Sequence, residues 1–119
     1  MDELSTSAST RVVEVDDGRI ERYAVAPEEL GLERAPDGAI VGGDPAANAA
    51  TTRAIFAGER GPARDLAVLN GGAAIYAGGR ADTLRQGVRL AERTLDDGAA
   101  LDALERFVAR THERATATP

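Results

Sequence analysis

Two adjacent acids near the start of the chain, Asp2 and Glu3, are the residues best suited to hold a metal ion. Carboxylate oxygens are hard ligands, and Mg²⁺ usually binds one or two of them together with substrate phosphates and waters. The small, polar and aperiodic residues 1–10 predict a loop. On a loop both carboxylates can face one ion, whereas neighbouring side chains of a strand point to opposite faces. The commoner alternative in an acidic chain is a solvated pair at a terminus.

The remaining nucleophiles and bases give weaker signals. His112 is the only histidine, so it cannot build a histidine-based metal site, and no nucleophile lies near it in sequence. We therefore expect it at the surface. Ser5, Ser7 and Ser9 lie in no motif of the nucleophile-elbow kind. We accordingly assign no catalytic and no cofactor-binding residue in this chain.

One glycine-rich turn invites comparison with a phosphate-binding loop. The stretch GGDPAANAA begins at Gly42, but it lacks the lysine and the further glycines of such a loop and follows only a weak strand signal at 39–41. Its composition is instead typical of a helix start, because Asp44 can cap the first turn and Pro45 suits the first helical position. We interpret it as a structural turn.

Composition limits the class of protein. The 119 residues suffice for one domain, and with two Phe, two Tyr and no Trp its core must be aliphatic. All 14 basic residues are Arg and the net charge is −6, which argues against nucleic acid and anionic membranes as main partners. Salt adaptation and coding bias are both open as reasons for the absence of Lys. There is no Cys, no signal-peptide pattern and no apolar run of roughly 20 residues, so we expect a cytoplasmic protein.

The loop that carries the two acids leads into a predicted β-hairpin. Apolar and polar residues alternate over 11–15 and 19–25, and the Asp17-Gly18 pair between them is a strong hairpin signal. A hairpin alone is marginally stable in water. We therefore expect a partner sheet or helices to cover its apolar face.

Four helices are predicted over 45–57, 62–77, 83–97 and 99–113 from glycine-containing breaks. A helical turn at 27–32, closed by Gly31, precedes them, and Asp82 is the expected N-cap of the third helix. Gly71 and Gly72 lie inside the second helix, where each costs roughly 1 kcal/mol relative to Ala. This cost suggests that another backbone packs close to them.

Apolar residues recur at helical spacing, which predicts the buried face of each helix. Small residues form the stripe of the first helix, and the second is apolar enough to be central. The stripes of the first, third and fourth helices are Ala47, Ala50, Ala54 and Ala57; Leu84, Val88, Ala91 and Leu95; and Leu101, Leu104 and Val108. Residues 1–114 are expected to form the domain portion, and 115–119 a disordered tail.

Three motifs together resemble the C-terminal region of the anthranilate phosphoribosyltransferases. They are Asp-Glu-Leu-Ser from Asp2, the hairpin followed by Pro-Glu-Glu-Leu-Gly-Leu from Pro27, and Gly-Gly-Asp-Pro-Ala-x-Asn from Gly42. The resemblance runs from Asp2 to about Val108 and corresponds to roughly the last third of the family's enzyme. It implies the C-terminal part of a phosphoribosyltransferase/nucleoside-phosphorylase-like α/β domain.

The resemblance also implies an activity: transfer of the phosphoribosyl group from phosphoribosyl pyrophosphate to anthranilate, releasing pyrophosphate, in tryptophan biosynthesis. Asp2 and Glu3 match the family's acid pair, which binds the Mg²⁺ that accompanies phosphoribosyl pyrophosphate. The family's glycine-rich pyrophosphate loop, its Lys-His-Gly-Asn segment, its anthranilate-contacting Arg and its dimer-forming N-terminal helical domain have no counterpart here. The chain therefore resembles a fragment, expected to be inactive alone.

Two other classes of function are kept as alternatives. Within the enzymes, the chain could belong to a related pyrimidine-nucleoside phosphorylase or a paralogous phosphoribosyltransferase with another aromatic acceptor. Outside them, it could be a non-catalytic helical interaction module. The sequence does not report the acceptor or the oligomeric state.

Overall fold

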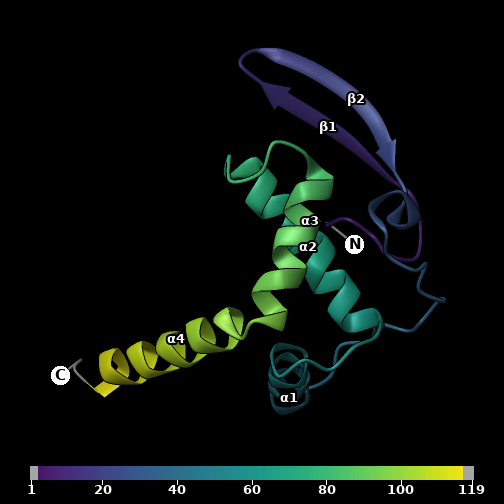
Figure 1. Cartoon of the computed structure of the whole chain (residues 1–119). Coiled ribbons are helices and arrows are strands. Elements are labelled where there is room, and N and C mark those ends of the chain that lie inside the picture. The colour runs from purple at the N-terminus through teal and green to yellow at the C-terminus, as the bar shows by residue number, and fades with distance from the viewer. Residues whose placement is uncertain (1–2, 117–119) are drawn as a thin grey trace.

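The computed structural model describes residues 3–116. Within these residues an antiparallel two-stranded hairpin is followed by a short 3₁₀ helix and four α-helices, which is the predicted α/β order. The hairpin arches over one end of the helices, and the helix nearest the C-terminus extends away from the others (Figure 1).

The hairpin has the predicted position and turn. Strand β1 spans Thr10–Asp16 and strand β2 spans Arg19–Val25, with Val15 opposite Ile20. The turn residues Asp17 and Gly18 have φ angles of 44° and 80°. A two-residue turn with positive φ at both positions matches the twist of the strands, which explains the Asp-Gly pair.

One apolar face of the hairpin is uncovered. Val13, Val15 and Ile20 are 60%, 69% and 56% exposed, while Val12 and Glu14 on the other face of β1 are half-buried. The helices therefore cover the face that carries Glu14. The expectation that the hairpin needs a further partner is consistent with these exposed side chains.

The 3₁₀ helix Pro27–Leu30 has the expected closing residue, and the helix α1, Pro45–Phe56, begins as predicted and ends one residue before the predicted bound of 57. Gly31 closes the first with a φ of 85°. At the start of α1 the Asp44 carboxylate accepts a hydrogen bond from Ala47 N at 2.8 Å, and proline occupies the first turn. The predicted helix start, with Asp44 as its cap and Pro45 in its first turn, is confirmed.

The core lies where helix α2, Pro62–Ala77, packs against α3, Leu84–Asp96. Close contact between the two backbones is possible because of Gly72, where a Cβ would come within 2.5 Å of both Cα and N of Val88. The sequence-based expectation of a close backbone is thus confirmed. The buried apolar cluster comprises Leu32, Val68, Leu69, Val88, Ala91 and Leu95.

Other predicted details are wrong. Thr83, not Asp82, caps α3, because its side chain accepts from Gln86 N. Among the described residues, α1 has no buried side chain and neither does the last helix, α4, Ala99–Thr116. Their predicted inward stripes are therefore at most half-buried. No strand forms at 39–41.

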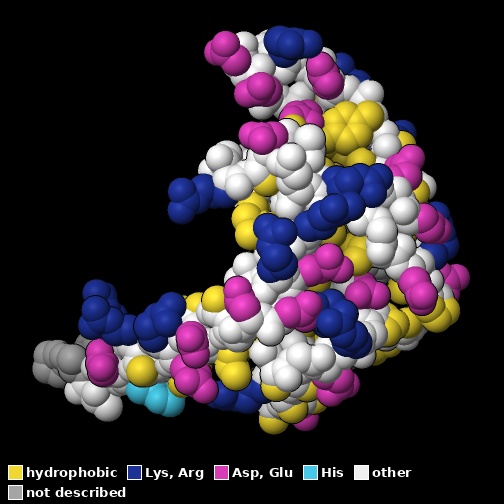
Figure 2. All heavy atoms as spheres, viewed as in Figure 1, with side chains coloured by type: hydrophobic (Ala, Val, Ile, Leu, Met, Phe, Trp, Pro, Cys, Tyr) yellow, Lys and Arg dark blue, Asp and Glu magenta, His cyan; other side chains and the backbone are white. Residues whose placement is uncertain are grey.

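Helix α4 projects away from the other helices. It extends to one side in Figure 1, and the space-filling view shows a hollow face between it and the hairpin, with acidic and basic side chains interspersed (Figure 2). Phe107 is 65% exposed on it. The helix also continues through Ala115 and Thr116, two residues expected in the disordered tail, whereas residues 117–119 lie outside the described part.

Candidate metal-binding loop

The loop that follows the acid pair is attached to the central helix by one asparagine. The Leu4 N–H donates to Oδ1 of Asn70 at 2.9 Å, and Nδ2 of Asn70 donates to the Leu4 carbonyl at 3.0 Å. Nδ2 also donates to the carbonyl of Leu66, one turn earlier in α2, at 3.1 Å. Both backbone polar groups of Leu4 are therefore held by a side chain that α2 itself orients.

Side chains within the loop fix its path into β1. The Ser5 N–H donates to Oγ1 of Thr10 at 3.0 Å, and the Ser7 N–H donates to Oγ of Ser5 at 3.1 Å. Such local side-chain hydrogen bonds are typical of serine and threonine in turns. Ser5 and Ser7 thus have a structural part in the loop, which agrees with their lack of a nucleophile motif.

A third attachment comes from the segment after the 3₁₀ helix. Thr6 is fully buried, and its carbonyl accepts from the Ala35 N–H at 3.0 Å. Nη1 of Arg34 donates to the Ser7 carbonyl at 3.2 Å, while its Nε donates to Glu28 at 2.7 Å. The backbone of the loop is therefore held by the rest of the fold from Leu4 onward.

Glu3, which directly precedes the held residue, has chemistry that fits a hard cation. Its side chain is exposed, and no described residue forms an ion pair or hydrogen bond with its carboxylate. Within residues 3–116 no three His, Cys, Asp or Glu side chains gather closely enough to form a complete metal site. The donor set fits Mg²⁺ held by few carboxylates, with phosphate and water oxygens completing its shell. Asp2 lies outside the described residues.

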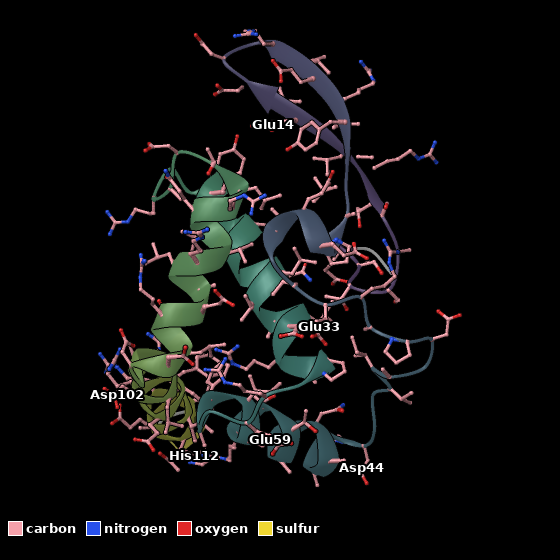
Figure 3. The ribbon with its side chains drawn as sticks, turned by 45° about the vertical axis from the view of Figure 1, so that its right-hand side comes forward. Glu14, Glu33, Asp44, Glu59, Asp102 and His112 are labelled. Carbon is pink, nitrogen blue, oxygen red and sulfur yellow. The ribbon has the colours of Figure 1, made fainter. Side chains whose placement is uncertain are left out.

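A cavity of about 560 Å³ adjoins this loop between β1 and the end of α2. Leu4 lines it together with Glu14, Tyr23 and Tyr76. Glu14 points from the hairpin toward the helices in Figure 3 and accepts hydrogen bonds from both tyrosine hydroxyls, from Tyr23 at 2.7 Å. These contacts connect the hairpin to α2.

The hydrogen bonds at Glu14 shift three acid–base equilibria. The bonds from Tyr76 and from Tyr23 lower the pKa of the Glu14 carboxyl, since they favour its ionised form. The bond to Glu14 raises the pKa of Tyr23 to about 12, with burial as the second cause. The pKa of Tyr76 is raised as well, again chiefly by Glu14.

A buried arginine attaches α2 to the end of α3. Arg64 is 3% exposed, and its Nη2 donates to Oδ1 of Asp96 at 2.7 Å. Arg60, from the turn before α2, also reaches Asp96, at 3.3 Å. The pair lies at the opposite end of α2 from this cavity and links α2 to the last residue of α3.

Sequence reasoning missed Asn70, Glu14 and Arg64. Each lies at a polar position of a regular helix or strand, and the pattern of such positions does not show which of them turn inward. One signal was available: Asn has low helix propensity, so an Asn inside an apolar helix suggests a specific partner. His112 is exposed on α4, as expected, and lies far from the loop (Figure 3).

No helix within residues 3–116 is both long enough and apolar enough to cross a lipid bilayer.

Comparison with known proteins points to one enzyme family. The chain is 53% identical over 110 residues to the anthranilate phosphoribosyltransferase of Rubrobacter xylanophilus, covering 91% of this chain and 32% of that protein. The enzyme of the same name from Methanobrevibacter smithii is 45% identical over 112 residues, covering 94% and 33%. The chain thus spans about a third of the length of the curated relatives it matches.

The fold agrees with this comparison. The crystal structure of anthranilate phosphoribosyltransferase (TrpD) from Thermus thermophilus superposes with a TM-score of 0.83 at 46% identity, covering 92% of this chain and 32% of that one. The family described as "Glycosyl transferase family, a/b domain" matches residues 1–101. Both sequence and fold place the chain in that glycosyl transferase family, as part of its a/b domain.

Proposed function

We propose that the chain forms the metal-binding third of an anthranilate phosphoribosyltransferase. The whole enzyme would transfer the phosphoribosyl group of phosphoribosyl pyrophosphate to the amine of anthranilate, giving N-(5-phosphoribosyl)anthranilate and pyrophosphate. The observation that carries the proposal is 53% identity over 110 residues to an enzyme of that name. The ordered loop after the acid pair supports it, because a metal site requires a fixed backbone.

In this proposal Asp2 and Glu3 are the metal-holding residues. Bound Mg²⁺ would offset negative charge on the leaving pyrophosphate. The exposed carboxylate of Glu3 is free of protein partners within the described residues, so it is available as an oxygen ligand. The loop holds the backbone next to these acids in place, which reduces the conformational entropy lost when an ion binds.

The rest of the enzyme would supply the other contacts to both substrates. It would also cover the apolar face of the hairpin, where Val13, Val15 and Ile20 are exposed. A homodimer formed through an N-terminal helical domain completes the proposal. Helices α2 and α3 serve as the scaffold that carries the loop.

A chimeric enzyme tests this proposal. The matching segment of the Rubrobacter xylanophilus relative is replaced by this chain, and anthranilate fluorescence is followed with phosphoribosyl pyrophosphate and Mg²⁺. We expect steady consumption of anthranilate by the chimera and none by the isolated chain. A folded chimera without turnover would contradict the proposed function, and steady turnover by the isolated chain would contradict the assignment as one third of an enzyme.

A further inference from the structure

Asn70 holds the backbone directly beside the proposed metal-binding acids. Its amide pairs with both the N–H and the carbonyl of Leu4, at 2.9 and 3.0 Å, across 66 positions of sequence. An amide that pairs with both polar groups of one residue fixes the orientation of that residue as well as its position. Glu3 directly precedes Leu4 in the chain, so its backbone is bonded to the residue that Asn70 fixes.

The orientation of Asn70 is itself fixed. Its Nδ2 also donates to the Leu66 carbonyl in the preceding turn of α2, at 3.1 Å. Two nearby residues of this helix, Leu69 and Gly72, are buried in the core. The asparagine therefore connects the loop to the helix that carries the buried core.

We propose, on the basis of the proposed function, that Asn70 is a positioning residue for the metal site, acting through the backbone of Leu4. It touches neither ion nor substrate. It sets the direction of the backbone at Leu4, and thereby the placement of Glu3, the residue directly before it. Groups that orient metal ligands typically change metal affinity or activity by about 10–100-fold when removed.

The chain contains a matched control for this contact. Asn48 makes the same two bonds to another residue: its Oδ1 accepts from Gly43 N at 2.8 Å, and its Nδ2 donates to the Gly43 carbonyl at 3.0 Å. That pair lies at the start of α1, outside the loop of residues 3–10. Asn48→Ala therefore removes an equivalent pair of hydrogen bonds without releasing Leu4.

The first measurement is hydrogen exchange in the isolated chain. Asn70→Ala should accelerate exchange of the Leu4 amide by about tenfold or more, since that amide loses its acceptor, whereas Asn48→Ala should leave it unchanged. Protection of Val68 and Val88 in the core shows whether each variant is folded. An unchanged Leu4 amide in folded Asn70→Ala would overturn the proposal.

The second measurement uses the chimeric enzyme and varies Mg²⁺. Asn70→Ala should raise the Mg²⁺ concentration for half-maximal turnover by about 10–100-fold and recover turnover at high Mg²⁺, with KM for anthranilate unchanged. Asn48→Ala should follow the parent curve. Identical Mg²⁺ curves for the two variants, or a loss that no Mg²⁺ concentration restores, would overturn the role of Asn70. Turnover by the parent chimera keeps that outcome distinct from failure of the proposed function.

Discussion

Gly72 of α2 lies so close to Val88 of α3 that there is no room for a side chain. A Cβ on Gly72 would lie 2.5 Å from the Cα and from the N of Val88, a separation that real Cβ atoms do not adopt. The two helices therefore meet backbone to backbone at the centre of the core. This packing fixes the position of α2, the helix that carries Asn70.

Substitution of the two neighbouring glycines should have opposite effects. Gly72→Ala is expected to lower the free energy of unfolding by about 3 kcal/mol or more, because it forces the helices apart. Gly71→Ala meets only Ala91 Cβ, at 3.6 Å, and should raise that free energy by about 0.5–1 kcal/mol through the lower entropy of the unfolded chain. Urea denaturation measures both, and equal effects would contradict the close packing.

Much of this fold could be predicted from the sequence. The helical spacing of apolar residues indicated the helices, and Gly71 and Gly72 indicated a close contact between backbones. Caps such as Asp44 and turns such as Asp17-Gly18 are local, so the residues themselves determine them. The orientation of the hairpin could not be predicted in this way. Val13 and Val15 follow the alternation of a buried face, yet they are exposed, because the described residues provide no element to cover them.

The candidate site was only partly predictable for the same reason. The acid pair Asp2-Glu3 was found from its chemistry and from family resemblance. Asn70 was not found, because a contact between residues 66 positions apart depends on how α2 is placed relative to the loop. Periodicity shows which side of a helix is apolar, but it does not show which backbone lies opposite a polar residue.

The ion pair between Arg64 and Asp96 should matter for stability. Asp96→Asn leaves a guanidinium that is 3% exposed without its charged partner, so we expect a loss of about 2–3 kcal/mol in the free energy of unfolding. Arg60→Ala is the control, since Arg60 reaches the same carboxylate from a 71% exposed position and should change stability by about 0.5 kcal/mol or less. Comparable losses in both variants would contradict the structural role of Arg64.

Stability should depend on pH through Glu14 and Tyr23. Folding raises the pKa of Tyr23, so its hydrogen bond to Glu14 stabilises the folded state fully at pH values below the ordinary pKa of 10.0. This stabilisation is lost as the pH rises through about 12. Folding lowers the pKa of Glu14, so its ionised carboxylate stabilises the folded state fully at pH values above the ordinary pKa of 4.5. This stabilisation is lost as the pH falls through the lower pKa that Glu14 has in the folded state. Tyr23→Phe should therefore have a melting temperature below that of the parent near neutral pH, and the gap should narrow toward both extremes. A difference in melting temperature that stays the same at every pH would contradict this prediction.

The hairpin should exchange its amide hydrogens faster than the core. Its outer face is uncovered, so residues 11–25 of the isolated chain should be poorly protected and α2 well protected. In the chimeric enzyme, protection of the hairpin should rise because its apolar face is covered. Equal protection of hairpin and α2 in the isolated chain would refute the need for a covering element.

The most direct test of the account is the Mg²⁺ dependence of turnover in chimeras that carry Asp2→Ala or Glu3→Ala. If the acid pair holds the metal, each variant should lose turnover by about 10-fold or more at low Mg²⁺, and the loss should shrink as Mg²⁺ approaches saturation. Parent kinetics in both variants at every Mg²⁺ concentration would contradict it, and would leave this chain with a scaffold role alone.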